Sequence, residues 1–232
     1  MKQPVMIMPR KIVMKLASFL NYYFQLYIVR DPFLLNVKRW FADKGDQTLR
    51  LNYQLDKSSV VFDVGGFLGD YADAIYQKFG CRIYLFEPVP LFYKECVKRF
   101  SGNPSIVCLN YGLSSKSGWF AINLKNNESS FNKIETGVLT QQAEVRSITD
   151  TVAELGIEII DLIKINIEGG EFDLLPQIID SGLIKRTKYV QVQFHNFDAG
   201  AADARLRIRN SLERTHREIW NYEFVWESWE RL

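Results

Sequence analysis

The chain has 232 residues, which is enough for one or two domains with a hydrophobic core of their own. Its content of 47% hydrophobic and 24% charged residues is typical of globular proteins and excludes a disordered chain. The 29 basic and 27 acidic residues give a net charge of only +2, which argues against nucleic acid as the main partner.

The first 57 residues predict a helical extension that precedes a domain at 58–232. Apolar side chains follow a helical stripe at Ile12, Leu16, Phe19, Leu20, Tyr23, Leu26 and Tyr27. Polar residues interrupt this stripe, so it is too short to span a membrane, and it has no signal-peptide cleavage site. Lys2, Arg10, Lys11 and Lys15 make its beginning basic. Two interpretations stay open: the helix packs on the domain or on a second subunit of a homodimer, or it lies on an anionic membrane surface.

From Ser59 onward, short apolar runs alternate with helical patterns. Strands are predicted at 60–64, 82–86, 105–109, 162–167 and 189–194, and helices at 71–79, 91–100 and 172–179. An extra pair of strands at 119–124 and 143–148 precedes a short helix that Asp150 would cap. The chain is then expected to end with a long charged helix at 201–220 and a strand at 223–226. This alternation predicts an α/β fold with a mostly parallel sheet covered by helices on both faces.

A glycine-rich loop follows the first predicted strand. Gly65, Gly66 and Gly69 allow a tight turn whose backbone N–H groups can bind a ligand. Glu87 follows the next strand, where a carboxylate commonly accepts hydrogen bonds from ribose hydroxyls. A dinucleotide or S-adenosylmethionine would fit such a site. The glycine spacing differs from the dinucleotide pattern, and the Asp63 carboxylate would repel a pyrophosphate. The loop therefore favours S-adenosylmethionine, whose ammonium and sulfonium groups a carboxylate can serve.

Two later strands carry one polar row each: Lys164, Asn166 and Glu168 on the first, and Gln191, Gln193 and His195 on the second. Dry, unpaired polar rows are costly in a buried sheet, so we expect them to face a ligand cleft or one another, or to lie at the rim of the sheet. Lys164 is expected to pair with Glu168 or Glu171. His195 follows its strand and is the candidate general base near neutral pH.

No metal site and no disulfide are predicted. Asp161, Glu168, Glu171, Asp173 and His195 have the chemistry to hold a divalent ion, but they form no compact ligand motif. Cys81, Cys96 and Cys108 lack metal-site spacing, and their odd number does not suit a disulfide framework. A reducing, cytoplasmic location is therefore expected.

Four segments of the chain resemble the FkbM family of S-adenosylmethionine-dependent methyltransferases: residues 61–65, 85–88, 112–114 and, most specifically, 161–171. The resemblance covers residues from about Val60 to Phe194. It implies a Rossmann-like, class I methyltransferase fold with a seven-stranded sheet and three layers. It also implies O-methylation of a sugar, a polysaccharide precursor or a natural product. Weaker alternatives are a non-catalytic binding protein on this fold and a nicotinamide-dependent oxidoreductase.

The residue patterns and the resemblance together assign roles to residues. The predicted cofactor-binding residues are Asp63, Gly65, Gly66, Phe67, Gly69, Glu87, Pro88, Asn110, Gly112, Leu113 and Asn166, and the predicted catalytic residues are His195, Glu168, Asn166 and Lys164. Asn166 stands where the family has Asp, and an amide cannot take up a proton. His195, and after it Glu168, is therefore the expected base. Trp220, Tyr222, Trp226 and Trp229 are expected either to stack on a sugar ring or to pack in the core.

Overall fold

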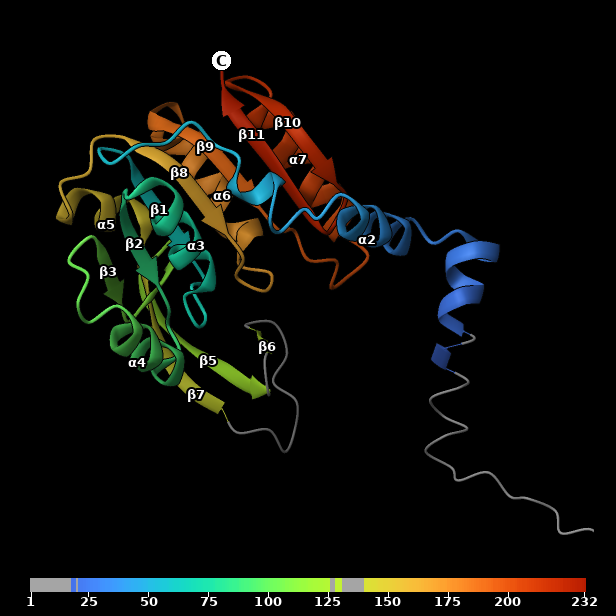
Figure 1. Ribbon diagram of the computed structural model, residues 1–232, viewed down its shortest axis with the longest axis horizontal. Coiled ribbons are helices and arrows are strands. Elements are labelled where there is room, and N and C mark those ends of the chain that lie inside the picture. The colour runs from blue at the N-terminus through green and yellow to red at the C-terminus, as the bar shows by residue number, and fades with distance from the viewer. Residues whose placement is uncertain (1–17, 20, 126–127, 131–139) are drawn as a thin grey trace, which may run out of the picture.

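The computed structural model describes residues 18, 19, 21–125, 128–130 and 140–232 (Figure 1). Its centre is a seven-stranded sheet in the order β10-β11-β9-β8-β1-β2-β3. These strands are β1 (Val60–Val64), β2 (Arg82–Phe86), β3 (Ile106–Leu109), β8 (Ile160–Ile165), β9 (Thr187–Val192), β10 (His216–Tyr222) and β11 (Trp226–Arg231). All neighbours are parallel except β11, which is antiparallel to both β9 and β10. The expected mostly parallel, seven-stranded class I methyltransferase fold is confirmed.

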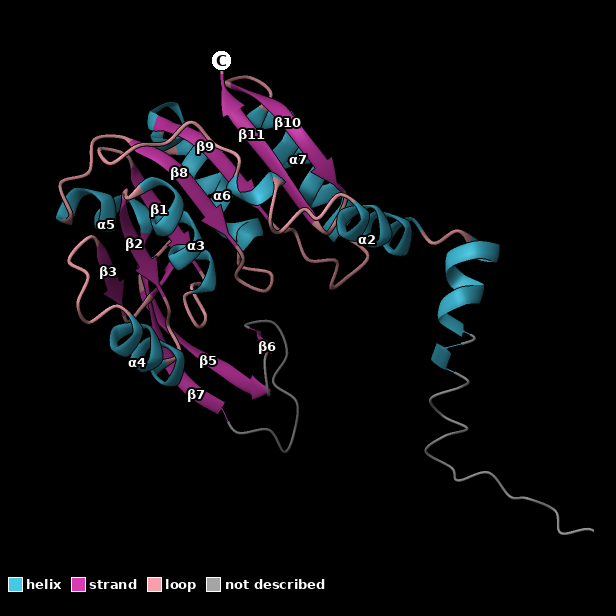
Figure 2. Cartoon of the chain, in the orientation of Figure 1, coloured by secondary structure: helices cyan, strands magenta, loops and turns pink. Residues whose placement is uncertain are grey.

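Helices cover both faces of this sheet (Figure 2). Alternate residues of each strand point to opposite faces, so every central strand contributes to two hydrophobic cores. On one face, Val61, Ile83 and Leu162 pack with α3 (Asp70–Phe79) and α4 (Pro90–Arg99). On the other face, Phe62, Ile163 and Val190 pack with α5 (Ile148–Glu154), α6 (Glu171–Asp180) and α7 (Ala201–Leu212). The apolar runs of the sequence are therefore buried on both sides.

The predicted extra strands form a second sheet in the order β4-β7-β5-β6. Its strands are β4 (Gly112–Ser114), β5 (Gly118–Lys125), β6 (Glu128–Ser130) and β7 (Thr140–Ser147). The helix that follows, α5, is capped by Ser147, whose hydroxyl accepts a hydrogen bond from the Asp150 N–H. The prediction of Asp150 as the cap was wrong because the helix begins earlier, at Ile148.

The prediction of one long helix at 201–220 was also wrong. The helix α7 ends at Leu212, and the chain then forms the antiparallel pair β10 and β11. A strand near the edge of a sheet tolerates many charged side chains, so its composition is close to that of a charged helix. Trp229 is fully buried in this pair, and Tyr222 and Trp226 pack in a cluster with Trp40. Tyr222, Trp226 and Trp229 therefore form core packing and do not offer a surface for a sugar.

The N-terminal extension combines helical turns with a segment that joins the core. Residues 18, 19 and 21–24 are helical and lead into η1 (Gln25–Val29), α2 (Pro32–Ala42) and η2 (Leu49–Leu51). Trp40 packs on Tyr222, with ring centroids 5.2 Å apart, and Tyr53 is buried under the sheet. Ile12, Leu16 and Leu20 of the predicted stripe lie outside the described residues. No described helix combines the length and the hydropathy needed to cross a membrane.

Candidate functional site

The strand order places a topological switch point between β1 and β8. The chain runs from β1 outward to β2 and β3, and it returns on the other side of β1 as β8. Ligands of such sheets bind beyond the carboxyl ends of the strands at this point. The Gly65–Gly69 loop follows β1 there, and Asn166 follows β8, its N–H donating to the Val64 carbonyl at 3.0 Å. The predicted site residues of these two strands therefore converge.

The glycines of the loop are required by the backbone. Gly65 and Gly69 have φ values of +82° and +83°, which side-chain-bearing residues rarely adopt. A Cβ on Gly65 would lie 2.0 Å from the Asn166 carbonyl oxygen, and one on Gly69 would lie 2.6 Å from the Phe100 ring. Contact between these glycines and a cofactor stays a prediction, since the space beside each is filled by the protein itself.

The Gly69→Val variant should therefore lose stability, not only ligand binding. The sequence alone predicts that a valine here blocks the cofactor, whereas in the structure it would strain the backbone and strike Phe100. We expect a loss of about 2–4 kcal/mol in the free energy of unfolding, measured by urea denaturation. Gly102→Val is the matched control, because nothing lies within 4 Å of that position. Equal stability of the two variants would contradict this explanation.

Glu87 connects the glycine loop to the end of β2. One carboxylate oxygen accepts the Phe67 N–H and the other accepts the Val89 N–H, both at 2.8 Å. The side chain is only 5% exposed, and burial raises its pKa to about 7. Each oxygen keeps a further acceptor position, so the carboxylate can still receive hydroxyl groups. Asn110 lies beside it and donates its amide N–H to the Glu87 carbonyl at 3.0 Å.

Lys164 and Asp63 form a buried ion pair beneath the loop. The Lys164 ammonium lies 2.8 Å from an Asp63 carboxylate oxygen and donates to the Gly65 carbonyl at 2.7 Å. The expected pairing of Lys164 with Glu168 or Glu171 was therefore wrong. Burial lowers the pKa of Lys164, although Asp63 opposes that shift. Because both side chains are buried, Lys164 is a positioning residue that holds the loop, and the predicted catalytic role does not fit its place.

The polar row does not open into a cleft at Gln191. This side chain is fully buried, and its amide hydrogen-bonds the Tyr53 hydroxyl at 2.8 Å. Tyr53 belongs to the N-terminal extension, which thus covers the row at Gln191. At Lys164 the row is covered by Tyr71 of α3, whose ring centroid lies 5.8 Å from the ammonium group. The polar rows were expected to face a ligand cleft, to contact one another or to lie at the rim of the sheet. At Lys164 and Gln191 they are satisfied by contacts within the protein.

Asn166 differs from Asp63 and Lys164, which at least contact each other as an ion pair. Its side-chain oxygen is buried and has no hydrogen-bond partner among the residues that the structure describes. A buried acceptor without a donor is costly, by about 1–3 kcal/mol. A buried acceptor without a partner calls for an explanation, and at the switch point a ligand donor would provide one.

His195 lies at the end of β9, held between two carboxylates. A Glu171 oxygen accepts the His195 backbone N–H at 2.8 Å and lies 3.0 Å from Nδ1, while a Glu168 oxygen lies 3.5 Å from Nε2. Burial by itself would lower the pKa of His195, but Glu168 and Glu171 raise it to about 9. A base poised near neutral pH was therefore the wrong expectation. Sequence reasoning placed Glu171 at a helix start but missed its role as the partner of His195.

Glu168 adopts an unusual backbone conformation, with φ +51°, directly before Gly169 with φ +103°. A side-chain-bearing residue in this region costs about 1–3 kcal/mol and is found mainly where structure and function require it. Here the turn directs the Glu168 carboxylate back toward His195.

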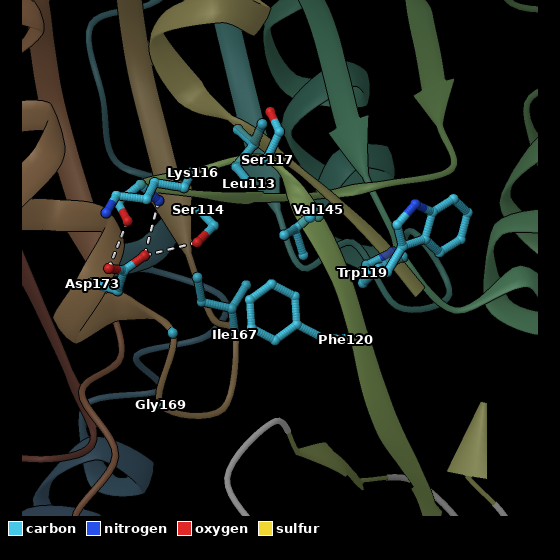
Figure 3. A pocket seen from close by; sticks show the side chains of 15 residues that line it. Leu113, Ser114, Lys116, Ser117, Trp119, Phe120, Val145, Ile167, Gly169 and Asp173 are labelled. Carbon is cyan, nitrogen blue, oxygen red and sulfur yellow. Dashed lines mark hydrogen bonds between the residues drawn. The ribbon is translucent and has the colours of Figure 1, made fainter. Parts of the chain in front are cut away.

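A cavity of about 400 Å³ opens beside this edge of the sheet, between the two sheets (Figure 3). Three predicted cofactor residues, Pro88, Gly112 and Leu113, line it. Figure 3 shows Ile167, Phe120 and Val145 gathered between Trp119 and Asp173. Sequence reasoning missed the side chains that β5 contributes, although Trp119 and Phe120 were visible as an aromatic pair on a predicted extra strand.

Asp173 fixes one wall of this first cavity. Its carboxylate accepts the Ser114 hydroxyl at 2.7 Å, the Ser115 N–H at 2.8 Å and the Ser115 hydroxyl at 2.7 Å. Burial alone would raise the pKa of Asp173, but these hydrogen bonds outweigh it and hold the pKa below its ordinary value. The ionised carboxylate therefore ties α6 to β4.

A second cavity, of about 490 Å³, lies on the other side of Gly169, which lines both. Its walls are Gly169, Phe172, His195, Phe197, Asp198, Gly200, Ala201 and Ala204. The rings of His195 and Phe197 are stacked, with centroids 5.3 Å apart and planes within 5°. In the described part of the chain, no group of three or more His, Cys, Asp and Glu side chains is arranged to hold a metal ion.

The chain is similar to known methyltransferases. The family model described as the methyltransferase FkbM domain matches residues 63–224. No curated protein sequence matches the chain. Among solved structures, an rRNA methylase from Streptococcus thermophilus has 12% identity and a TM-score of 0.48, covering 83% of this chain and 96% of its own. Aeropyrum pernix fibrillarin, solved with natively bound S-adenosyl-L-methionine, has 8% identity and a TM-score of 0.47, with coverages of 82% and 74%.

Proposed function

The chain belongs to the FkbM methyltransferase family, and on that premise we propose that it transfers a methyl group from S-adenosylmethionine to a hydroxyl of a saccharide or a related polyhydroxylated acceptor. The observation that carries the proposal is the first cavity at the carboxyl edge of the sheet, which is lined by Pro88 and Ile167, the residues that follow Glu87 and Asn166 in the chain. Its volume of about 400 Å³ is within the range of small-molecule sites.

The residues at this edge fit the cofactor. Glu87 would accept the ribose hydroxyls with the acceptor positions that its two backbone contacts leave open. Asn166 would accept from the ammonium group, which would satisfy its orphaned oxygen. The apolar walls formed by Pro88, Ile167 and Phe120 suit the adenine ring. Asp63, which is neutralised by Lys164, would support the loop from below.

The second cavity supports a polyhydroxylated acceptor. Phe197 is 44% exposed, and the apolar face of a sugar ring can pack on such an aromatic side chain. Asp198 at the same cavity offers an acceptor for hydroxyl groups. The His195 ring lines this cavity as well, so its imidazole would lie beside a hydroxyl group bound there.

His195 would take up the hydroxyl proton. When bound, S-adenosylmethionine supplies a methyl group on positively charged sulfur, so the C–O bond forms as the C–S bond breaks and a neutral thioether leaves. Glu171 accepts from Nδ1–H and orients the ring, as in other carboxylate-oriented histidine bases. The Nε2 lone pair of the neutral ring would face the substrate hydroxyl once the Glu168 carboxylate, 3.5 Å from Nε2, turns aside. Positioning by the pocket walls supplies the rest of the rate enhancement.

Isothermal titration calorimetry tests the cofactor assignment. We expect micromolar binding of S-adenosylmethionine and S-adenosylhomocysteine and no binding of NAD or NADP. Failure of both sulfur compounds to bind would end the proposal. Transfer of a labelled methyl group to a panel of saccharides then tests the acceptor class. Cofactor binding without transfer to any hydroxyl compound would favour the non-catalytic alternative.

The Glu87→Ala variant should weaken cofactor binding by about 1–3 kcal/mol, because a charged acceptor for the ribose is lost. Titration calorimetry with S-adenosylhomocysteine measures this loss. Glu87→Gln should bind with intermediate affinity, since one acceptor oxygen is kept. Glu95→Ala, at an exposed position of α4, is the matched control and should bind as the wild type does. Full affinity of the Glu87→Ala variant would refute a role for this carboxylate.

A further inference from the structure

The N-terminal arm, which we define as the described residues 18, 19 and 21–42, exposes an unusual amount of apolar surface. Ten of the 21 exposed large hydrophobic side chains in the described structure lie in it: Phe19, Tyr22, Tyr23, Phe24, Tyr27, Ile28, Val29, Phe33, Leu35 and Phe41. Six of these ten are exposed by more than half of their surface, and Ile28 by 70%. So dense a set of exposed apolar side chains marks an interaction surface.

The charge of the chain is also divided unevenly. Residues 1–42 contain seven of the 29 basic residues and one of the 27 acidic residues, so this segment carries a net charge of +6 and the remaining chain −4. On α2, Lys38 and Arg39 flank a groove of about 550 Å³ that Pro32, Leu35, Asn36 and Ala42 complete. Neither basic side chain forms an ion pair with a carboxylate in the described residues.

We propose that the N-terminal arm docks the protein onto an anionic lipid surface. Aromatic side chains with a polar edge, of which the arm has three tyrosines, favour the interface between water and lipid. Among the described residues, Lys38 and Arg39 beside them donate only to the neutral side chains of Tyr27 and Asn36, so their charges stay available to anionic headgroups. A second copy of the arm is a poorer partner, because its charge has the same sign. Residues 43–232 have a net charge of −4, so anionic headgroups would repel this part of the chain.

The arm is connected to the catalytic domain by packed residues. Figure 1 shows the helix that ends at Val29 standing apart from the sheet, with α2 between the two. Trp40 at the end of α2 packs on Trp220 and Tyr222 of β10, with centroids 5.7 and 5.2 Å apart. Docking of the arm would therefore hold the domain next to the lipid surface.

Cosedimentation with vesicles tests the proposal on the full chain. Binding should be strong to vesicles of phosphatidylcholine with phosphatidylserine, weak to phosphatidylcholine alone, and reduced by added salt. The double variant Lys38→Gln with Arg39→Gln should lower the partition coefficient on the anionic vesicles by about tenfold or more. The triple variant Tyr23→Ser, Phe24→Ser and Ile28→Ser should lower it by at least about tenfold through lost apolar contact.

Matched controls come from α4, which carries exposed residues of the same kinds. Lys94→Gln with Lys98→Gln, and Leu91→Ser with Val97→Ser, should bind the vesicles as the wild type does. Circular dichroism and cofactor titration verify that each variant is folded. Equal binding to both vesicle types, or equal losses in the α4 controls, would overturn the proposal. So would sedimentation equilibrium showing that the triple variant dissociates a dimer while its vesicle binding is unchanged. Binding of S-adenosylhomocysteine is measured separately, so a failure of the lipid proposal can be distinguished from a failure of the proposed enzymatic function.

Discussion

The His195→Ala variant is expected to bind S-adenosylhomocysteine as tightly as the wild type and to lose about 10²–10⁴-fold in methyl transfer, the usual loss for a general base. The ring lines the second cavity and not the first, so its removal should spare the cofactor. Calorimetry measures the first quantity and transfer of a labelled methyl group the second. Unchanged turnover would show that another group takes the proton, with Glu168 the next candidate.

The pH dependence of the wild type follows from the same geometry. With a pKa of about 9, His195 is mostly an imidazolium at neutral pH and cannot accept a proton. Turnover should therefore rise by about tenfold per pH unit until the pH reaches about 9. Glu171→Gln keeps one acceptor oxygen for His195, gives up the acceptor for the Gly169 N–H and removes the negative charge, so the rising limb should move to lower pH. A flat profile through this range would contradict the assignment.

The pKa itself can be measured without knowing the acceptor. The chain has only two histidines, so NMR titration of the ring protons gives two curves, and His195→Ala identifies one of them. We expect the His195 curve near pH 9. The His216 curve should lie below the ordinary histidine value, because that ring is buried and burial lowers its pKa. A His195 midpoint at or below the ordinary value would show that Glu168 and Glu171 do not hold the imidazolium.

The Lys164→Met variant should lose about 3–5 kcal/mol of unfolding free energy, the usual cost of leaving one member of a buried ion pair alone. Asp63 would be left fully buried without its cation, and the Gly65 carbonyl would lose its donor. Urea denaturation followed by circular dichroism measures the loss. Because Lys164 holds the glycine loop, cofactor affinity should fall as well.

The double variant Lys164→Met with Asp63→Asn separates charge burial from packing. Removing both charges should restore much of the stability, since the penalty arises from the uncompensated carboxylate. Lys188→Met, at a partly exposed position of β9, serves as the control and should unfold within about 0.5 kcal/mol of the wild type. If Lys164→Met were as stable as this control, the buried ion pair would not support the loop.

Much of the fold was predictable because its signals are local. The predominantly apolar runs at 82–86 and 60–64 became β2 and β1 with the same bounds, since a strand buried on both faces needs apolar side chains at most positions. Asp63 is tolerated inside β1 because Lys164 pairs with it. The strand at 216–222 was missed because its charged residues suit a helix equally well, and only pairing with β11 decides between them. Local sequence pattern therefore predicted the strands at the centre of the sheet better than those at its edge.

By itself, the sequence determined the element types in the centre of the sheet, the glycine turn after β1 and the family, all of which depend on neighbouring residues and short motifs. Only the tertiary structure decided the partners of the polar side chains. Lys164 meets Asp63 across 101 positions of the chain, and Glu171 reaches His195 across a helix and a strand. Such pairings depend on strand order and register, and they set the charge of His195. The chemistry of the site therefore follows from contacts that no local pattern contains.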